Sequence, residues 1–201
     1  MPKLTRKLMT AGVFALLFAG SFAAAQAPRI LRGTIDKVNA ATITIKTSSG
    51  ADVNVRILDN AKVFGVKAAT LADIKQGDWI GVGAMPQPDG SQKAMQVTIF
   101  SEAQRGVGAG FRPWTKPGST MTNGTAGNPV ASVNGQVVMV AYKGGEQKVI
   151  IGPDAKIRRY VAGTRQQLKP GTHVSVYNPA KAPDGTLRTA RVNFGIGDMM
   201  P

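Results

Sequence analysis

Apolar and polar residues alternate along several short stretches of this chain. Ile43 and Ile45 alternate with threonine and lysine, and Val53, Val55 and Ile57 follow the same rhythm after a turn containing Gly50. A period of two residues is typical of a strand with one buried face. The pattern predicts strands at 32–38, 42–46, 52–57, 78–82 and 95–99. A single helical turn is expected before the fourth strand, with Thr70 as its N-cap and Gly77 at its end.

The same pattern recurs about 95 residues further along the chain. The matching segments are Asn60–Val63 with Asp154–Ile157, Ile74–Gly77 with Leu168–Gly171, and Asp89–Gly90 with Asp184–Gly185. In the second copy, strands are expected at 137–142, 147–151, 172–177 and 189–194, with a weaker opening strand at 129–133. A repeat of this length decides the architecture, because each copy is one folding unit.

Three strands, a helical turn and two more strands follow one another in the order of an OB-fold, a five-stranded Greek-key barrel. We therefore expect an all-β protein with two tandem OB-like barrels, at 29–100 and 130–195, and a tail at 196–201. A small β-sandwich in each copy would give a similar pattern. The connecting segment 101–129 contains six glycines and three prolines. It is either a flexible linker or an ordered strap anchored by Trp114.

Residues 1–25 have the features of a secretory signal peptide. Lys3, Arg6 and Lys7 precede an apolar run at 13–22, and three alanines end at Ala25, where we place cleavage. An uncleaved anchor is the alternative. The chain contains no cysteine, so it has neither disulfides nor a lipid-modified cysteine. Small secreted eukaryotic domains often depend on disulfides. These features together predict a bacterial periplasmic protein.

The formal net charge of +14 falls to +11 without the predicted leader, because Lys3, Arg6 and Lys7 are removed with no acidic residue. Such a charge favours anionic partners, among them anionic glycans, lipid head groups and nucleic acid. It also keeps a protein soluble without any partner. Aromatic residues make up only 6% of the chain, which argues against nucleic acid.

Catalytic and metal-binding patterns are weak in this sequence. His173 is the only histidine, so a catalytic triad or a zinc site has few possible members. The aspartates, including Asp73, Asp89 and Asp184, occupy positions typical of turns and caps. The Met199–Met200 pair could attract copper(I) but belongs to the tail. We predict a protein that is not an enzyme and has no catalytic residue, cofactor or metal site.

Further short motifs occur at Gly33–Ile35, Leu71 with Ile74–Asp78, Asp89–Gly90, Gly110–Trp114 and Pro117–Asn123. Together they resemble the motifs of a bacterial family of exported tandem domains of unknown function. The resemblance covers nearly the whole chain after the leader, and some similar chains are described as related to metal ABC transporters. It implies no catalytic residues. A permease role conflicts with the absence of further apolar stretches long enough to span a membrane.

Basic and aromatic residues predict a ligand-binding face, like the one that OB-folds use to bind oligonucleotides or oligosaccharides. Trp79 is out of phase with the core positions Ile80 and Val82, so it should point outward above the bare backbone of Gly81 and Gly83. Alternatively, Trp79 shields these glycines, or Trp114 docks on them. The full set of candidate residues is Trp79, Arg112, Trp114, Arg158, Arg159, Tyr160, His173 and Tyr177.

Three hypotheses for function follow from these patterns. The first is a binding or adaptor protein for another envelope protein. The second is a module for a polyanion or oligosaccharide that uses the candidate residues, and the third is an accessory protein of a metal-transport system. Ionic strength distinguishes the first two, because charge-dominated binding weakens as salt rises.

Overall fold

The structure is a computed structural model that describes residues 29–133 and 135–201. The described residues form strands and short turns of 3₁₀-helix, so the all-β prediction is confirmed. The predicted signal peptide at 1–25 lies outside the described residues. Among the residues that are described, no helix is long and apolar enough to cross a membrane.

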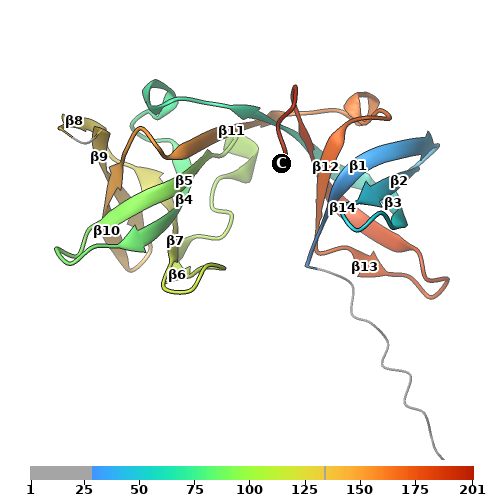
Figure 1. Ribbon diagram of the computed structural model, residues 1–201, viewed down its shortest axis with the longest axis horizontal. Coiled ribbons are helices and arrows are strands. Elements are labelled where there is room, and N and C mark those ends of the chain that lie inside the picture. The colour runs from blue at the N-terminus through green and yellow to red at the C-terminus, as the bar shows by residue number, and fades with distance from the viewer. Residues whose placement is uncertain (1–28, 134) are drawn as a thin grey trace, which may run out of the picture.

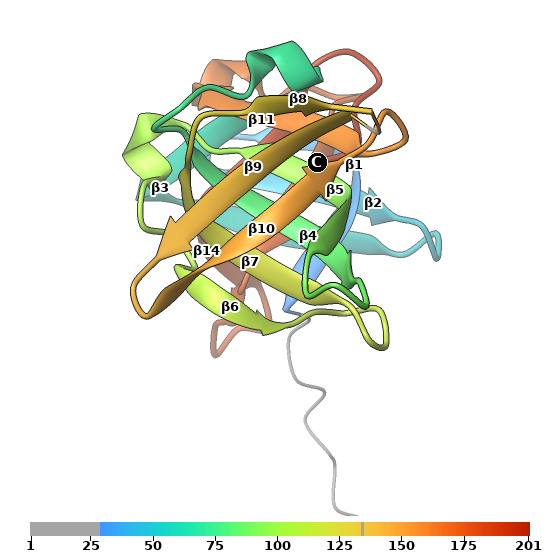
Figure 2. The same ribbon diagram turned by 90° about the vertical axis from the view of Figure 1, so that its left-hand side faces the viewer.

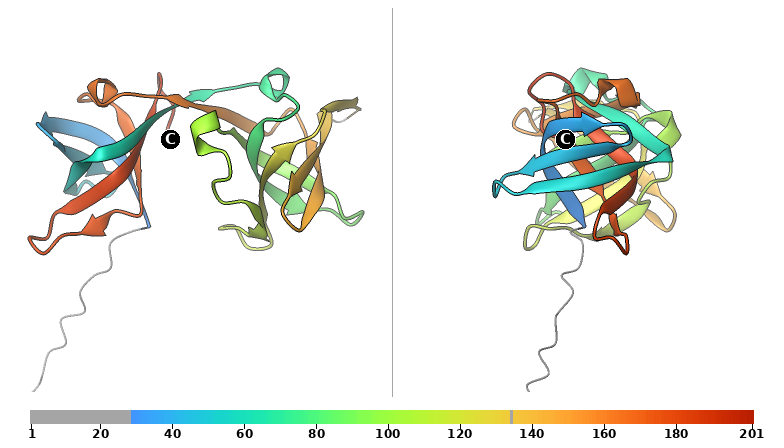
Figure 3. Two further views of the ribbon diagram at one scale, coloured as in Figure 1. Left: turned by 180° about the vertical axis from the view of Figure 1, so that it is seen from behind. Right: turned by 90° about the vertical axis from the view of Figure 1, so that its right-hand side faces the viewer.

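Five strands form a closed barrel, which we call the first barrel (Figure 3, right). They are β1 (Ile30–Asn39), β2 (Thr42–Thr47), β3 (Asp52–Ala68), β12 (His173–Tyr177) and β14 (Leu187–Gly195). Their pairings run β1–β2–β3–β14–β12 and return to β1. All neighbours are antiparallel except β3 and β14, which are parallel. Closure removes the unpaired edges that open sheets expose.

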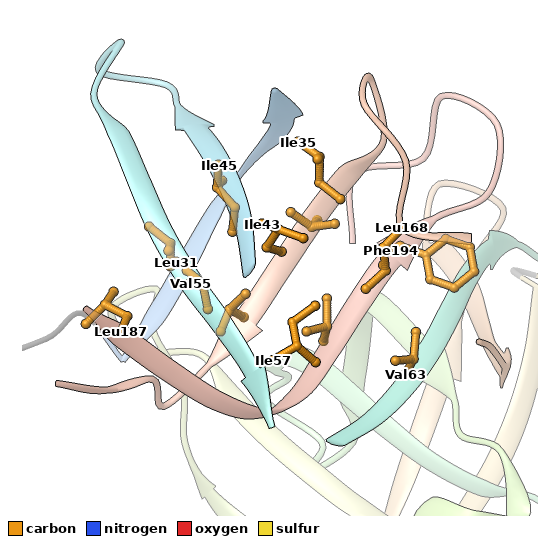
Figure 4. Close-up of a cluster of buried hydrophobic side chains, with 13 residues drawn as sticks. Leu31, Ile35, Ile43, Ile45, Val55, Ile57, Val63, Leu168, Leu187 and Phe194 are labelled. Atoms are coloured by element: carbon orange, nitrogen blue, oxygen red, sulfur yellow. The ribbon is translucent and has the colours of Figure 1, made fainter. Parts of the chain in front are cut away.

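Alternate residues of these strands fill the first barrel with aliphatic side chains (Figure 4). Ile35, Ile43, Ile45 and Val55 are almost fully buried, as the two-residue period predicted. Burial of each such side chain contributes about 1.5–3 kcal/mol to the free energy of unfolding.

Five other strands pair in a second ring (Figure 2). They are β4 (Trp79–Pro86), β5 (Gln92–Ile99), β7 (Thr120–Ala126), β9 (Gly135–Tyr142) and β10 (Gly145–Ile151). Their pairings run β4–β5–β10–β9–β7 and return to β4, with β5 and β10 parallel. Ile80, Val82, Val97 and Val138 belong to its buried cluster.

Each ring takes strands from both predicted repeats. Leu168 comes from the second repeat but is buried in the core of the first barrel. Ile74, from the first repeat, is buried in the core of the second ring. The predicted domains at 29–100 and 130–195 therefore do not match the cores. The tandem arrangement of two barrels is not confirmed, because periodicity identifies strands without showing which strands pair.

The segment 101–129 contains regular structure in place of a tether. It holds the 3₁₀ turn η2 (Glu102–Gln104), β6 (Gly110–Pro113) and β7, and β6 pairs with β7. The opening strand of the second ring is β7, whereas the sequence suggested 129–133. Only the short β8 (Val130–Ser132) forms there. Buried Thr122, Asn123 and Gly124 gave β7 no hydrophobic alternation.

A two-stranded bridge joins the rings (Figure 1). The second half of β3 pairs antiparallel with β11 (Lys156–Ala162), and Val66 lies opposite Tyr160. β11 also pairs in parallel with β5. The chain reaches the opposite ring after β3 through η1 (Leu71–Asp73) and after β11 through η3 (Arg165–Gln167). The remaining strand, β13 (Ala180–Lys181), pairs with β14.

Carboxylates close the tight turns, as their sequence positions predicted. Asp73 accepts hydrogen bonds from the backbone N–H and the hydroxyl of Thr70, at 2.7 and 2.9 Å. Asp89 and Asp184 accept the same pair of bonds from Ser91 and Thr186. These bonds hold the pKa of each carboxyl below its ordinary value, because they favour the charged form.

Candidate ligand-binding cleft

A cleft of about 930 Å³ lies where the first barrel, the second ring and the bridge meet. Its lining includes residues of β1, β12 and β14 on one side and of β4, β5, β6 and β7 on the other. β11 contributes Arg158 and Tyr160 from the bridge. The volume falls within the range of about 300–1,000 Å³ that is usual for small-ligand sites. We call this space the inter-ring cleft.

Four arginines line the inter-ring cleft, namely Arg32, Arg112, Arg158 and Arg191. No aspartate or glutamate is among the described lining residues. Within the described ranges, none of the four guanidinium groups forms an ion pair. The cleft therefore concentrates positive charge that no carboxylate side chain neutralises, and it favours an anionic ligand.

Aromatic rings fix the position of Arg191. Its Cζ atom lies 5.1 Å from the ring centroid of Tyr177 and 5.5 Å from that of Phe64. Its Nε donates to Oδ1 of Asn193 at 3.4 Å. Cation–π contacts of this kind hold the planar guanidinium in place. A guanidinium with a fixed position loses less conformational entropy when it binds an anion.

Tyr160 and Arg158 line the cleft from the bridge strand β11. Nδ2 of Asn193 donates to the Tyr160 hydroxyl at 3.3 Å, and Nε of Arg158 donates to Oγ1 of Thr98 at 3.0 Å. Burial raises the pKa of Tyr160 well above its ordinary value, and the neighbouring Tyr177 adds to this effect. Tyr160 therefore stays a neutral hydroxyl at physiological pH.

The indole of Trp114 lies on the backbone of Gly83. A Cβ atom at Gly83 would overlap the Trp114 ring, so only glycine allows this contact. The alternative in which Trp114 docks on the glycines is therefore observed at Gly83, whereas Phe100 and Asn123 lie over Gly81. Trp114 is partly exposed and lines the inter-ring cleft, as does Phe100. The cleft thus has an apolar surface on the side of the second ring.

Asn123, on β7, lines the inter-ring cleft and is only 5% exposed. Its Nδ2 donates to the carbonyl oxygen of Val107 at 3.0 Å. Its Oδ1 is buried and has no hydrogen-bond partner among the described residues. Buried polar atoms normally have a partner, so this acceptor is a candidate contact for a ligand donor.

The inter-ring cleft brings five of the eight candidate residues together: Arg112, Trp114, Arg158, Tyr160 and Tyr177. The other three lie outside its lining. Trp79 is not in either core cluster but is only 9% exposed, and its Nε1 donates to the carbonyl oxygen of Val107. Trp79 therefore does not present an open face, and its indole N–H contacts the segment 101–129 at Val107.

The remaining two candidates have partners within the protein. Nδ1 of His173 lies 2.9 Å from the hydroxyl of Thr34 on the neighbouring strand. Arg159 donates to the carbonyl oxygen of Asp73 at 2.6 Å and lies 3.6 Å from the Asp78 carboxylate. Arg159 therefore ties β11 to the turn before β4.

Sequence reasoning missed Arg32, Arg191, Gln96, Thr98 and Asn123. These residues belong to strands that are far apart in the sequence, and only the exchange of strands between the rings brings them to one cleft. An available signal was the outward phase of Arg32 between the buried Leu31 and Gly33.

Residues of the C-terminal tail also reach the cleft. Met200 and Pro201 are among its lining residues, and Pro201 is buried. The C-terminus lies between the two rings in Figure 1. The tail lies against the end of β14, because a Cβ atom at Gly195 would meet the backbone of Met199. The tail forms one boundary of the ligand space.

Metal-binding side chains are sparse in the part of the chain that the structure describes, which contains no cluster of three or more histidine, cysteine or acidic residues. No family model, curated protein or solved structure matches this chain. The resemblance to exported bacterial domains stays a prediction.

Proposed function

We propose that this protein is an exported, non-enzymatic binding protein of the bacterial cell envelope that holds an anionic ligand in the inter-ring cleft. One observation carries the proposal. Four arginines converge on a cleft whose described lining contains no acidic side chain. Guanidinium groups bind carboxylate, phosphate and sulfate groups through paired N–H donors, and a recessed site strengthens these bonds.

The strand order supports the same proposal. In each ring, the third strand of one predicted repeat pairs in parallel with the fifth strand of the other. These pairs are β3–β14 and β10–β5. We infer that both rings are OB-like barrels that arose by duplication and exchanged their last two strands. OB-folds commonly bind oligosaccharides and oligonucleotides on their exposed strand faces.

Arginine side-chain NMR tests the proposal directly. Protein labelled with ¹⁵N is titrated with sodium sulfate, and the Nε–Hε signals of the arginines are followed. We expect the signals of Arg32, Arg158 and Arg191 to shift at lower sulfate concentrations than that of Arg188, which lies outside the cleft lining on β14. Added sodium chloride should weaken the effect, because salt screens the charges.

A matched pair of variants controls for net charge. Arg191→Gln and Arg188→Gln each remove one positive charge from the same strand. We expect sulfate affinity to fall several-fold in Arg191→Gln and to stay near the parent value in Arg188→Gln. If all arginine signals shift together, or if both variants behave alike, the cleft is not the binding site.

A role as an adaptor for another envelope protein is the second candidate. Val130 on β8 is 59% exposed, and Met139 on the adjacent β9 is 37% exposed. Apolar side chains that neighbour each other on a surface favour protein contacts. A complex held by this surface should be nearly insensitive to salt and should be weakened by Met139→Asp, with no effect of Arg191→Gln.

A further inference from the structure

The two sides of the inter-ring cleft correspond to each other in the sequence pattern but differ in chemistry. Offsets of 94 and 95 residues align Tyr177 with Gly83 and Arg191 with Gln96. Strand pairing adds a third correspondence, between Arg32 and Asn123. Arg32 pairs with Ser175, and Asn123 pairs with Gly81, the residue aligned with Ser175. All these positions except Ser175 and Gly83 line the cleft, and Gly83 lies beneath Trp114, which does.

The side formed by the first barrel is cationic. Arg32 and Arg191 project from β1 and β14, and Tyr177 packs against the Arg191 guanidinium. The two arginines have no ion-pair partner among the described residues. This side is suited to one compact anionic group, which a planar guanidinium can bind through two N–H donors.

The side formed by the second ring carries mainly neutral side chains. Gln96 and Asn123 stand where the first barrel has arginines, and Trp114 covers Gly83 where the first barrel has Tyr177. The unpartnered Oδ1 of Asn123 is an acceptor, which favours a ligand N–H or O–H donor and disfavours an anion. Arg112 is the one cation among the described lining residues of this side, and its Nη1 donates to the carbonyl oxygen of Gly108 at 2.7 Å.

We propose that the ligand is a short sugar that carries an anionic group and binds in one orientation. Its anionic group contacts Arg32 and Arg191, and a neutral ring lies against Trp114 with its hydroxyls bonded to Gln96 and Asn123. This inference rests on the proposed function. A ligand charged along its whole length fits less well, because part of it would face the Asn123 acceptor.

Calorimetry with matched probes tests the orientation. A panel of disaccharides is used, each as the neutral parent and in singly sulfated, phosphorylated or uronate form, together with inorganic sulfate and phosphate. We expect at least one charged disaccharide to bind more than tenfold more tightly than both its neutral parent and the free anion. If no charged disaccharide exceeds the free anion, the sugar assignment is wrong, although anion binding in the cleft stands.

Variants on each side show which part of the probe each side binds. Gln96→Ala should reduce the advantage of the charged disaccharide over inorganic sulfate, whereas Arg191→Gln should weaken both. Arg188→Gln serves as the charge control, and thermal unfolding verifies that each variant is folded. Equal loss of both probes in Gln96→Ala would contradict the proposed orientation.

Two other anionic probes complete the test. Adenosine monophosphate represents nucleotides, and vesicles of phosphatidylglycerol represent an anionic membrane. If either of these probes binds in the cleft more tightly than every charged disaccharide, the sugar assignment is wrong. If no anion of any kind perturbs the cleft arginines, the proposed function itself fails, and the two failures are thereby distinguished.

Discussion

Val66 on β3 lies directly opposite Tyr160 on β11, and the two residues are separated by the 94-residue offset of the predicted repeat. The flanking pairs are consistent with this symmetry, since Phe64 pairs with Ala162 and Ala68 pairs with Arg158. A pseudo-twofold axis therefore passes through the Val66–Tyr160 pair. Around this axis, each half of the chain supplies strands to the ring of the other half.

The exchange predicts how the chain behaves when it is divided. Cutting the exposed loop after Lys116 gives fragments 29–116 and 117–201, and neither contains all the strands of one ring. We expect the fragments to form a stable 1:1 complex when mixed and neither to fold as a monomer. Light scattering after size exclusion and circular dichroism measure this. A fragment that is monomeric and unfolds cooperatively would show that each repeat folds by itself.

Leu168 provides a test of which core it stabilises. Leu168→Ala should lower the free energy of unfolding by about 2–5 kcal/mol, because it opens a cavity in a packed core. Hydrogen exchange should accelerate first in β1 and β2, which are distant from Leu168 in sequence but share its cluster. Val138→Ala is the matched control and should affect β4, β5 and β9. Faster hydrogen exchange in β9 and β10 alone after Leu168→Ala would contradict the pairing of strands from the two repeats in one barrel.

Gly83 is expected to tolerate no side chain, because Trp114 occupies the space above it. Gly83→Ala should displace the indole, increase its quenching by acrylamide and weaken ligand binding in the cleft. Gly145→Ala is the control, since its Cβ would meet only the end of the Tyr142 side chain at 3.3 Å. Unchanged quenching in Gly83→Ala would mean that Trp114 does not rest on the glycine.

The raised pKa of Tyr160 predicts a loss of stability in alkali. The folded protein holds the phenolic proton more tightly than the unfolded chain, whose tyrosines ionise near pH 10. The contribution of Tyr160 is therefore complete below about pH 10 and is lost as the pH rises towards its folded pKa. Denaturant titrations from pH 8 to 11.5 measure the decline.

Tyr160→Phe is the control for this pH dependence. The free energy of unfolding of this variant should depend less on pH above 10. In a titration followed by tyrosinate absorbance, the step with the highest midpoint pH should disappear. An unchanged absorbance titration would show that another tyrosine holds the most tightly bound proton.

Much of the local structure could be predicted from the sequence. Alternation at Ile43, Ile45 and Val55 identified buried strands, and turn residues such as Asp89 and Gly90 identified the reversals between strands. β7 was missed because its buried Thr122 and Asn123 are polar. Five of the eight candidate ligand residues lie together in the inter-ring cleft, and they could be proposed because basic and aromatic side chains stand out in a chain with few aromatics.

The sequence by itself determined most of the strands and the turns, since these depend on neighbours within a few residues, and it predicted the equivalence of the two halves. Only the tertiary structure decided that β12 and β14 close the barrel of β1–β3. Two equivalent sets of strands can pair within a repeat or between repeats with nearly the same local contacts. The strands that pair in each ring are set by the paths of the chain through η1 and η3 and by the pairing of Val66 with Tyr160. The same pairing places the residues of the cleft.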